Sequence, residues 1–232
     1  MKIAFLGDLH GNFVATQALA EELKRQQVEE IVFLGDAVGK GPQNRETCDW
    51  VRDHCRLCIG GNWDYGIGGK EFAEDGYFWA QLGEERMKWL NALPREIDAW
   101  ISGVHFRLFH GRPVTPLMSV QADKEVLGAA FHANDTDYTG IIFADSHRPF
   151  VRTLAEGYAL NSGSVGNSLG VANAHALLIE GELGATERGV LTMTILSVPY
   201  DNEAAAEAAR QDPALPHRES FINEVLTGVY SR

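Results

Sequence analysis

The chain has 232 residues, of which 22% are charged and 45% hydrophobic, ordinary values for a globular protein with ample material for a core. Its 20 basic and 32 acidic side chains give a formal net charge of −12, which argues against binding a nucleic-acid polymer, because a polyanion would be repelled. The sequence has neither a secretory leader nor an apolar run of about 20 residues, and its 3 cysteines suit a reducing compartment. We therefore expect a cytoplasmic protein that does not associate with membranes.

Three strand–loop–helix units are predicted in the first part of the chain. Apolar runs at residues 2–7, 30–35 and 57–61 predict buried strands, and helical patterns follow at about 12–27 and 43–54. Successive units of this kind form a parallel sheet, so the carboxyl ends of the three strands meet at one edge, where ligands bind in open α/β sheets.

Each predicted strand delivers a polar side chain to this edge. Asp8 and His10 are two residues apart, so in an extended chain both side chains point the same way, off the end of the first strand. A carboxylate and an imidazole that converge there make half of a divalent-metal site. The alternative is that Asp8 only caps the next helix and His10 lies in a surface turn. Asp36 and Asn62 follow the second and third strands.

Residues 65–95 interrupt the regular alternation. Gly66, Gly68 and Gly69 predict a loose loop, and the helix-compatible sequence after them is rich in tryptophan and other large apolar side chains. This segment is either a cap whose aromatic side chains stack on a base or aryl group, or a helix that buries those side chains in the core.

The middle of the chain changes character. Residues 96–101 and 104–109 predict an antiparallel hairpin that ends in His110. Another buried strand is predicted at 139–144, and it ends in Asp145-Ser146-His147. The side chains of His110, Asp145 and His147, all of types that bind metals, are thus placed at strand ends.

The remaining elements are short. A helix is predicted near 123–132, and the glycine–serine turn at 161–167 is expected to bring backbone close to the site. Further strands are predicted at 151–154, 158–160, 175–180 and 190–197. The tail, at 203–210 and 219–226, is predicted to be helical and surface-facing, with no functional signal.

A parallel first half and an antiparallel second half predict two sheets packed face to face, with helices outside. There is no internal repeat or linker, and we expect residues 1–232 to form a single domain that admits a cap insertion at about 65–95.

The strand-end blocks resemble those of the calcineurin-like metallophosphoesterase superfamily, whose pattern runs D-x-H, G-D, G-N-H-[D/E], H and G-H-x-H. The corresponding blocks, in the same order, are Gly7-Asp8-Leu9-His10, Gly35-Asp36, Gly61-Asn62-Trp63-Asp64, His110-Gly111 and Ala144-Asp145-Ser146-His147. Residues 35–42 and 161–166 are most similar to the small bacterial and archaeal phosphodiesterases of the superfamily. The resemblance implies an α/β fold, a four-layer αββα sandwich of two mixed β-sheets, and hydrolysis of phosphoester bonds.

The resemblance also implies a centre of two divalent cations. The first would be held by Asp8, His10 and His147. The second would be completed by Asn62, His110 and Asp145, with Asp36 bridging both. Two cations about 3.5–4 Å apart clamp the phosphate oxygens and generate a bridging hydroxide that attacks in line with the leaving oxygen. Asn62 is also a candidate for catalysis and substrate binding. Arg112 is a candidate for a charge-assisted phosphate contact, or else a surface arginine on a turn.

Two positions depart from the family pattern. Trp63 stands where the family has the histidine that protonates the leaving group, a contribution of about 10²–10⁴-fold. Asp64, that histidine's usual partner, is then either a catalytic residue or the acceptor of a structural hydrogen bond.

The second departure is Asp145, which replaces the first histidine of the last block. If Asp145 ligates, the second cation sees mostly oxygen donors, which favours manganese or magnesium over zinc. The added negative charge also favours a monoanionic phosphodiester over a dianionic monoester. The alternative is that Asp145, being shorter than histidine, does not reach the cation.

We therefore expect a phosphodiesterase that acts on a small phosphodiester or nucleotide and uses two divalent metal ions, Mn²⁺ ahead of Mg²⁺, Fe, Ni²⁺ or Zn²⁺. The alternatives are a protein phosphatase, a dinucleoside polyphosphatase, or a non-catalytic binding or scaffold member of the fold. The sequence leaves the physiological substrate and the oligomeric state open. The histidines that match no block are expected to be structural: His54, His105, His132, His175 and His217.

Overall fold

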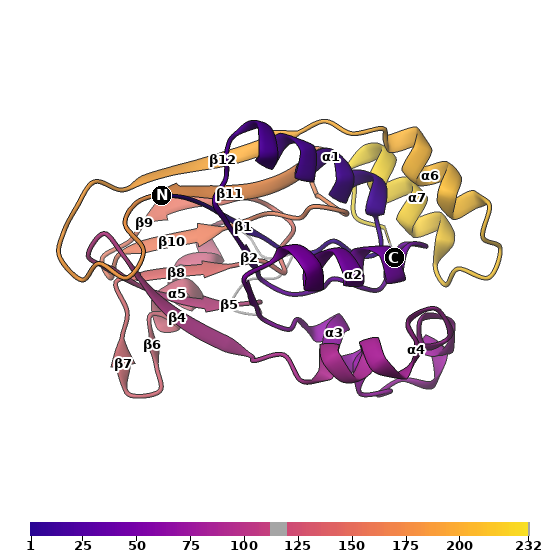
Figure 1. The fold of residues 1–232 in the computed structure, drawn as a ribbon, viewed down its shortest axis with the longest axis horizontal. Coiled ribbons are helices and arrows are strands. Elements are labelled where there is room, and N and C mark those ends of the chain that lie inside the picture. Colours follow the sequence, from indigo (N-terminus) through magenta and orange to yellow (C-terminus); the bar gives the residue numbers. More distant parts are fainter. Residues whose placement is uncertain (112–119, 232) are drawn as a thin grey trace.

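The computed structural model describes residues 1–111 and 120–231, which form two five-stranded sheets (Figure 1). The first sheet has the order β12 (Thr192–Val198), β11 (Ala174–Glu180), β1 (Lys2–Leu6), β2 (Glu30–Phe33) and β3 (Leu57–Cys58). The second has the order β4 (Glu96–Ile101), β5 (Val104–Phe109), β8 (Gly140–Phe143), β10 (Tyr158–Asn161) and β9 (Phe150–Thr153). A small hairpin is formed by β6 (His132–Ala133) and β7 (Thr136–Asp137).

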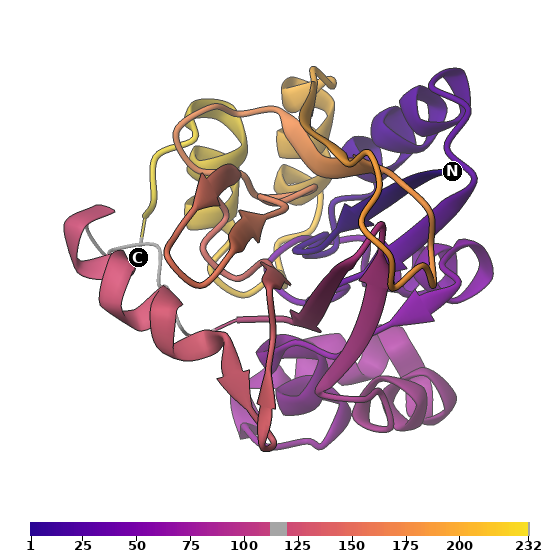
Figure 2. The ribbon, with the colours of Figure 1, turned by 90° about the vertical axis from the view of Figure 1, so that its left-hand side faces the viewer.

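The helices lie outside the two sheets. They are α1 (Phe13–Arg25), α2 (Asn44–His54), α3 (Asn62–Gly68), α4 (Gly76–Asn91), α5 (Val120–Ala130), α6 (Asn202–Arg210) and α7 (Arg218–Thr227), with a short 3-10 turn at Ala73–Asp75. Figure 2 shows α5 on the opposite side of the molecule from α1. The expected αββα sandwich of two mixed sheets is confirmed.

The burial of β1 explains why its sequence is a continuous apolar run. Ile3 and Phe5 belong to the core between the two sheets, whereas Ala4 and Leu6 belong to the core under the helices of the first sheet. Both faces of the strand are buried, as in parallel sheets covered on both sides. A third core, between α5 and the second sheet, contains Leu127.

Both sheets contain three adjacent parallel strands, so the prediction of an antiparallel second half was wrong. In the first sheet β1, β2 and β3 run parallel, and β11 and β12 pair antiparallel beside them. In the second sheet β5, β8 and β10 run parallel, and only the edge strands β4 and β9 are antiparallel. After β8 the chain forms the edge strand β9 first and then returns as β10, which lies between β9 and β8. The consecutive short strands therefore do not form a simple antiparallel meander.

The predicted loose loop after Asn62 was also wrong, because these residues form α3. Asp64 fixes the start of this helix by accepting the backbone N–H of Gly61 at 3.0 Å. Gly68 serves close packing, since a Cβ there would lie 2.7 Å from the carbonyl oxygen of Met87 in α4. Gly68 is therefore explained by contact between two helices.

Helix α4 packs its apolar side chains into the core under the first sheet. Phe78, Leu82, Met87 and Leu90 are all buried there. The backbone of Gly83 is not helical, with φ 70° and ψ 166°, and breaks the helix into two parts. These side chains bury the helix, one of the two alternatives for this segment, and the division of the chain into one domain with a cap stays a prediction.

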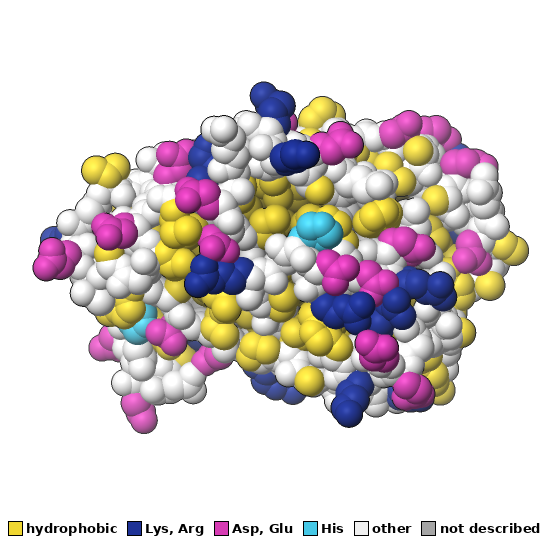
Figure 3. All heavy atoms as spheres, viewed as in Figure 1, with side chains coloured by type: hydrophobic (Ala, Val, Ile, Leu, Met, Phe, Trp, Pro, Cys, Tyr) yellow, Lys and Arg dark blue, Asp and Glu magenta, His cyan; other side chains and the backbone are white. Residues whose placement is uncertain are grey.

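The exposed face in Figure 3 carries acidic and basic side chains side by side, and basic side chains gather over α2 and α4. Arg86 of α4 pairs there with Asp49 of α2, with 2.6 Å between Nη2 and Oδ2. Within the described residues, no helix is both long and apolar enough to cross a membrane.

Candidate metal centre

The candidate ligands lie on the loops that follow parallel strands. Asp8, Asp36 and Asn62 come after β1, β2 and β3 of the first sheet, and His110 and Asp145 come after β5 and β8 of the second. The face-to-face packing of the sheets brings these loops together at one end of the sandwich. The sequence analysis placed these residues just after predicted strands, and the structure has a strand before each of them.

Several of these residues have an unusual backbone conformation. Positive φ values between 46° and 61° are found at Asp8, His10, Asp36, Asp145 and His147. Side-chain-bearing residues rarely adopt this left-handed region, and such strain concentrates at functional sites. Here it turns the chain sharply at the strand end, so that side chains from neighbouring residues reach the same space.

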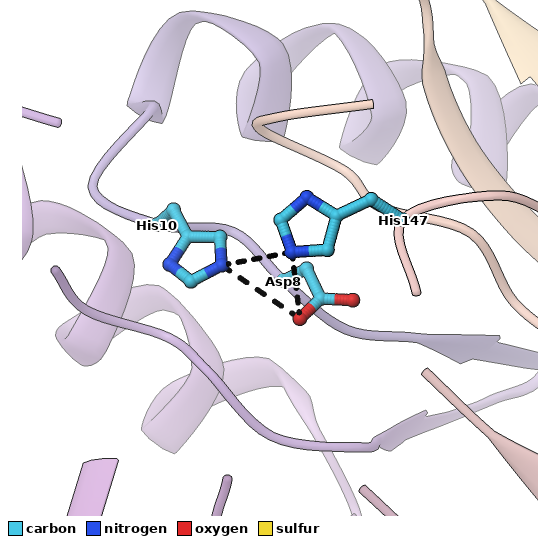
Figure 4. A group of neighbouring side chains, drawn as sticks. All are labelled: Asp8, His10 and His147. Atoms are coloured by element: carbon cyan, nitrogen blue, oxygen red, sulfur yellow. Dashed lines mark hydrogen bonds and ion pairs between the residues drawn. The ribbon is translucent and has the colours of Figure 1, made fainter. Parts of the chain in front are cut away.

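The first cluster contains Asp8, His10 and His147, all buried. Asp8 Oδ1 lies 3.8 Å from His10 Nε2 and 3.5 Å from His147 Nε2. The two Nε2 atoms are 3.2 Å apart. Figure 4 shows both imidazole rings with these nitrogens turned toward the Asp8 carboxylate. The three side chains come from β1 and β8 loops that are more than half the chain apart.

The second cluster contains Asp8, Asp36 and His110. His110 Nε2 lies 3.3 Å from Asp36 Oδ2 and 3.9 Å from Asp8 Oδ1. Asp36 Oδ2 is also 3.7 Å from His10 Nε2, so this carboxylate lies between a histidine of each cluster. Asp8 and Asp36 are thus both central to the arrangement.

The three histidines share one hydrogen-bond pattern. In each, Nδ1 lies next to a backbone carbonyl, which can only accept, so Nδ1 carries the proton. The carbonyl oxygens belong to Val38, Leu34 and Asn167, at 3.2, 2.7 and 2.6 Å from the Nδ1 atoms of His10, His110 and His147. In the neutral imidazole each Nε2 then presents a lone pair. Metal-binding histidines typically have this arrangement, because the partner of the other nitrogen fixes tautomer and ring orientation.

The site fits a divalent cation. Asp8 Oδ1 and His110 Nε2 are buried and make no hydrogen bond to any residue that the structure describes. Buried polar atoms of this kind are rare in native proteins and call for an explanation. Lone pairs of imidazoles and a carboxylate oxygen packed within 4 Å of one another repel unless a cation lies among them. Imidazole and carboxylate are ordinary ligands of manganese, iron, nickel and zinc.

Burial and neighbouring charges shift the pKa values within the site. Burial lowers the pKa of His10 and of His147, and the nearby Lys40 ammonium adds to the lowering. At His110 burial acts in the same direction, but Asp36, Asp8 and Asp145 outweigh it and raise the pKa above its ordinary value. Burial raises the pKa of Asp8, with Asp36 and Asp145 adding to the effect. The carboxylates therefore form an excess of negative charge, which a cation would offset.

Asp64 makes structural hydrogen bonds. It is fully buried and accepts the N–H groups of Asp36 at 2.7 Å and Ala37 at 2.9 Å, besides that of Gly61. Burial raises its pKa to about 7, and the charge of Asp36 contributes. Asp64 thus fixes the backbone that carries Asp36, which is the structural alternative stated for this residue.

The two residues before Asp64 lie at the rim. The backbone N–H of Trp63 donates to Asp36 Oδ1 at 2.9 Å, which turns Oδ2 of that carboxylate toward the histidines. Its half-buried ring stands edge-on to His10, with 5.8 Å between centroids. Asn62 is exposed at the first turn of α3, directly beside the Gly61–Asp36 contact.

Asp145 lies at the edge of the second cluster. Its Oδ1 is 3.6 Å from His110 Nε2, and its N–H donates to Asp8 Oδ2 at 3.1 Å. It belongs to neither group of three atoms within 4.8 Å of one another. Arg112, the candidate phosphate contact, lies outside the described residues.

Sequence reasoning missed three residues around the centre. Asn167, on the β10–β11 loop (residues 162–173), accepts from His147, and its side chain accepts from Lys40 Nζ at 2.6 Å. Lys40 also pairs with Glu224 of α7, which is buried together with Phe221 and Val225, so the prediction that the tail faces the surface was wrong for this helix. Asn167 and Lys40 lie in two segments that the sequence analysis singled out, 161–167 and 35–42, but Glu224 has no local signal at all.

The β10–β11 loop itself was predicted to approach the site, and it does. Val165 donates to the Gly7 carbonyl at 3.0 Å and Gly166 to the Asp8 carbonyl at 3.0 Å. A side chain at Gly166 would overlap the carbonyl oxygen of Leu9, so only glycine allows this approach.

A two-sheet sandwich with two clusters of carboxylate and imidazole at its strand ends defines a metallophosphoesterase-type fold with a candidate divalent-metal centre. The family model described as calcineurin-like phosphoesterase matches residues 1–175. The chain belongs to this family.

Comparison with known proteins gives the same fold. An uncharacterized protein of Methanocaldococcus jannaschii is 29% identical over 231 residues, covering 88% of this chain and 90% of the relative. A metallophosphoesterase from Sphaerobacter thermophilus superposes with a TM-score of 0.74 at 24% identity, and 99% of each chain is covered. A hypothetical protein from Pyrococcus horikoshii OT3 superposes with a TM-score of 0.78 at 20% identity, again over 99% of each chain.

Proposed function

We propose that the protein is a metal-dependent phosphodiesterase that hydrolyses a small phosphodiester or nucleotide. The observation that carries this proposal is the convergence of three imidazole Nε2 atoms on Asp8 Oδ1, all within 3.9 Å of it. Asp8, His10 and His147 would hold one cation, and Asp8, Asp36 and His110 would line the site of a second. When bound, such cations polarise phosphoryl oxygens and lower the pKa of water.

The residues of the chain prepare this site before substrate arrives. The Nδ1–H groups of the three histidines are held by backbone carbonyls, so the rings need not reorient to bind. The backbone N–H of Trp63 holds one oxygen of Asp36, which leaves the other directed at the cluster. Asp64 holds the Asp36 backbone from the other side. Such fixed groups cost little reorganisation during the reaction.

The charge of the site supports a diester as substrate. Asp8, Asp36 and Asp145 bring three carboxylates to two expected cations, and Asp145 Oδ1 lies close to His110. Compared with a neutral ligand at this position, the Asp145 carboxylate makes the site one unit less positive, which weakens the attraction for a dianionic monoester more than that for a monoanionic phosphodiester. Around the second cation, Asp36 and Asp145 would supply oxygen donors beside the nitrogen of His110, and this part of the donor set supports manganese over zinc.

The chemistry of Trp63 supports substrates with a stable leaving group. An indole N–H donates hydrogen bonds but does not release its proton near neutral pH, so Trp63 supplies no general acid. This counts against a protein phosphatase, whose serine or threonine leaving group is a strongly basic alkoxide.

The proposal is tested with the Mn²⁺-loaded protein on bis(4-nitrophenyl) phosphate and on 4-nitrophenyl phosphate. We expect kcat/KM for the diester to be at least about tenfold higher, because one extra unit charge costs more than about 1.4 kcal/mol in a partly screened site. Asp8→Asn is the matched control, since it keeps the side-chain shape and removes the shared charge. A higher rate on the monoester contradicts the diester preference, and activity that survives both EDTA and Asp8→Asn contradicts the metal-dependent mechanism.

A non-catalytic member of the family is the second candidate, and Trp63 is the observation that favours it. The aromatic ring takes the place of a proton donor beside His10. Metal content after mild purification separates the two: about two divalent ions per chain support the enzyme, and a metal-free protein that stays inactive with added Mn²⁺ supports the binding member.

A further inference from the structure

Asn167 contacts a candidate metal ligand and a buried ion pair at the same time. Its backbone carbonyl accepts the Nδ1–H of His147 at 2.6 Å, and its side-chain Oδ1 accepts Lys40 Nζ at 2.6 Å. The residue is fully buried, and its own N–H donates to Ser164 Oγ at 2.8 Å. The two ends of one residue therefore join the His147 imidazole to the Lys40 ammonium group.

Lys40 is itself fixed by a carboxylate from the far end of the chain. Its Nζ lies 3.4 Å from Glu224 Oε2, and the side chains are only 13% and 3% exposed. The backbone of Lys40 has a φ of 56°, in the loop after β2. Because a carboxylate buried this deeply is costly without a positive partner, the pair keeps the Lys40 ammonium directed inward, next to Asn167.

The chain that follows Glu224 is anchored close to this contact. Glu224 Oε1 accepts the N–H of Ser231 at 3.0 Å, and the Gly228 carbonyl accepts the N–H of Gly170 at 2.8 Å. One residue earlier, Leu169 donates to the carbonyl of His147 at 3.1 Å. The tail of the chain, which lies beyond the family match at residues 1–175, is thus joined to the segment that surrounds His147.

We propose that Lys40 and Glu224 are positioning residues that hold Asn167, and through its carbonyl the His147 ring, so that Nε2 faces Asp8 and His10. This inference rests on the metal-binding role proposed above for His147. Loss of the group that orients a metal-binding histidine lowers metal affinity about 10–100-fold. Lys40 and Glu224 act one residue further away, so we expect the lower end of this range, about tenfold.

The test is the double variant Lys40→Met/Glu224→Gln. It removes both charges together, so no buried charge is left unpaired, and glutamine still offers an acceptor to Ser231. We expect titration calorimetry to show Mn²⁺ affinity about tenfold weaker, with a metal-free melting temperature close to that of the parent. A ¹⁵N–¹H spectrum of the metal-free protein should also show the His147 ring losing its single Nδ1–H tautomer.

Two further variants make the result specific. Asp49→Asn/Arg86→Met removes a comparable ion pair between α2 and α4, and should leave Mn²⁺ affinity unchanged. His147→Ala shows the full effect of removing the ligand. The inference is overturned if the Lys40/Glu224 variant binds Mn²⁺ like the parent while His147→Ala does not, or if the control pair weakens binding equally. A parent protein that binds no Mn²⁺ refutes the proposed metal centre itself.

Discussion

Two kinds of buried histidine lie on either side of the β10–β11 loop. On one side, His10, His110 and His147 each donate Nδ1–H to a carbonyl and turn Nε2 toward carboxylates. On the other side, His175 of β11 has both nitrogens bonded to hydroxyls: Nδ1 is 2.8 Å from Ser168 Oγ and Nε2 is 3.1 Å from Ser197 Oγ. All four rings are buried, so burial alone does not distinguish a ligand from a structural residue.

The surroundings of His175 define its protonation state. The Ser168 hydroxyl donates to the carbonyl of Ser164 at 2.6 Å, so its oxygen accepts the Nδ1–H of His175. Ser197 accepts from Asn173 and is free to donate to Nε2. The ring is therefore satisfied as a neutral imidazole, and burial lowers its pKa to about 4. What distinguishes His10, His110 and His147 from His175 is that their Nε2 atoms face carboxylates rather than hydroxyl groups.

The largest expected effect is the loss of activity when a candidate ligand, His110, is removed, compared with the removal of the hydroxyl-bonded His175. His110→Ala should lower kcat/KM on the aryl diester by more than about 10²-fold, above what loss of an outer partner costs, because a ligand is removed. His175→Ala should keep the parent kcat/KM per folded molecule and lose stability instead, since it leaves a void and two hydroxyls without their partner. Steady-state kinetics and metal analysis of both variants measure this.

The distinction between the two kinds of histidine is contradicted if His110→Ala and His175→Ala have the same effect. Full activity of His110→Ala with two bound Mn²⁺ ions would mean that this imidazole is structural. Conversely, a His175→Ala protein that melts like the parent but has lost its metal would place His175 in the function of the centre.

The second prediction concerns pH. His175 has a pKa of about 4 in the folded protein against an ordinary value of 6.5, so the folded state binds fewer protons than the unfolded state between these pH values. The contribution of His175 to stability is complete above about pH 6.5 and is lost as the pH falls toward 4, by about 3 kcal/mol in total. Asp8 and Asp64, whose pKa values are raised, oppose this trend.

The effect of His175 is isolated by comparison with His175→Gln. Urea unfolding of both metal-free proteins at a series of pH values gives the difference in the free energy of unfolding, in which the other groups cancel. We expect that difference to favour the parent at pH 7 and to shrink as the pH approaches 4. A difference independent of pH would show that His175 is not held neutral by burial.

The sequence predicted which side chains meet at the candidate metal centre, because the signal for each of them is local. The blocks around Asp8, Asp36 and His110 combine a buried strand with a ligand-type residue at its end, and the parallel strands of both sheets bring such ends together. The alternation of strands and helices also predicted the first sheet. The hairpin at 96–109 was predicted to the residue because its turn is two residues long.

The rest depends on contacts between distant segments. The left-handed backbone of Asp36 and its neighbours in the site is imposed by tertiary packing, and no residue type announces it. Asp64 accepts both the N–H of Gly61 at the start of helix α3 and the N–H of Asp36 in the loop after β2, a contact between segments that the local sequence does not predict. Glu224 contacts Lys40 only once the first sheet and its helices have formed, so the ordinary charge pattern of the tail helix gave no sign of this contact.

The smallest expected effect tests whether the hydrogen bond to Val38 alone orients the ring of His10. The ring of Trp63 stands edge-on to His10 at 5.8 Å, and its other side fills the space above Gly39, where any Cβ would overlap it. Trp63→Phe keeps an aromatic ring but shortens it. An aromatic pair contributes about 0.5–1.5 kcal/mol, so we expect Mn²⁺ affinity to fall about fivefold.

Trp89→Phe is the matched control, since it makes the same change in α4 and its ring makes no contact with His10. Calorimetric titration with Mn²⁺ measures both variants. If Trp63→Phe alone weakens binding, the ring and the Val38 carbonyl together hold His10. If neither variant differs from the parent, the carbonyl is sufficient, and the contrast with His175 rests entirely on which atoms the two imidazole nitrogens meet. Equal losses in both variants would instead point to general loosening of the α3–α4 region, and the orientation of His10 would then depend on the core rather than on one neighbouring ring.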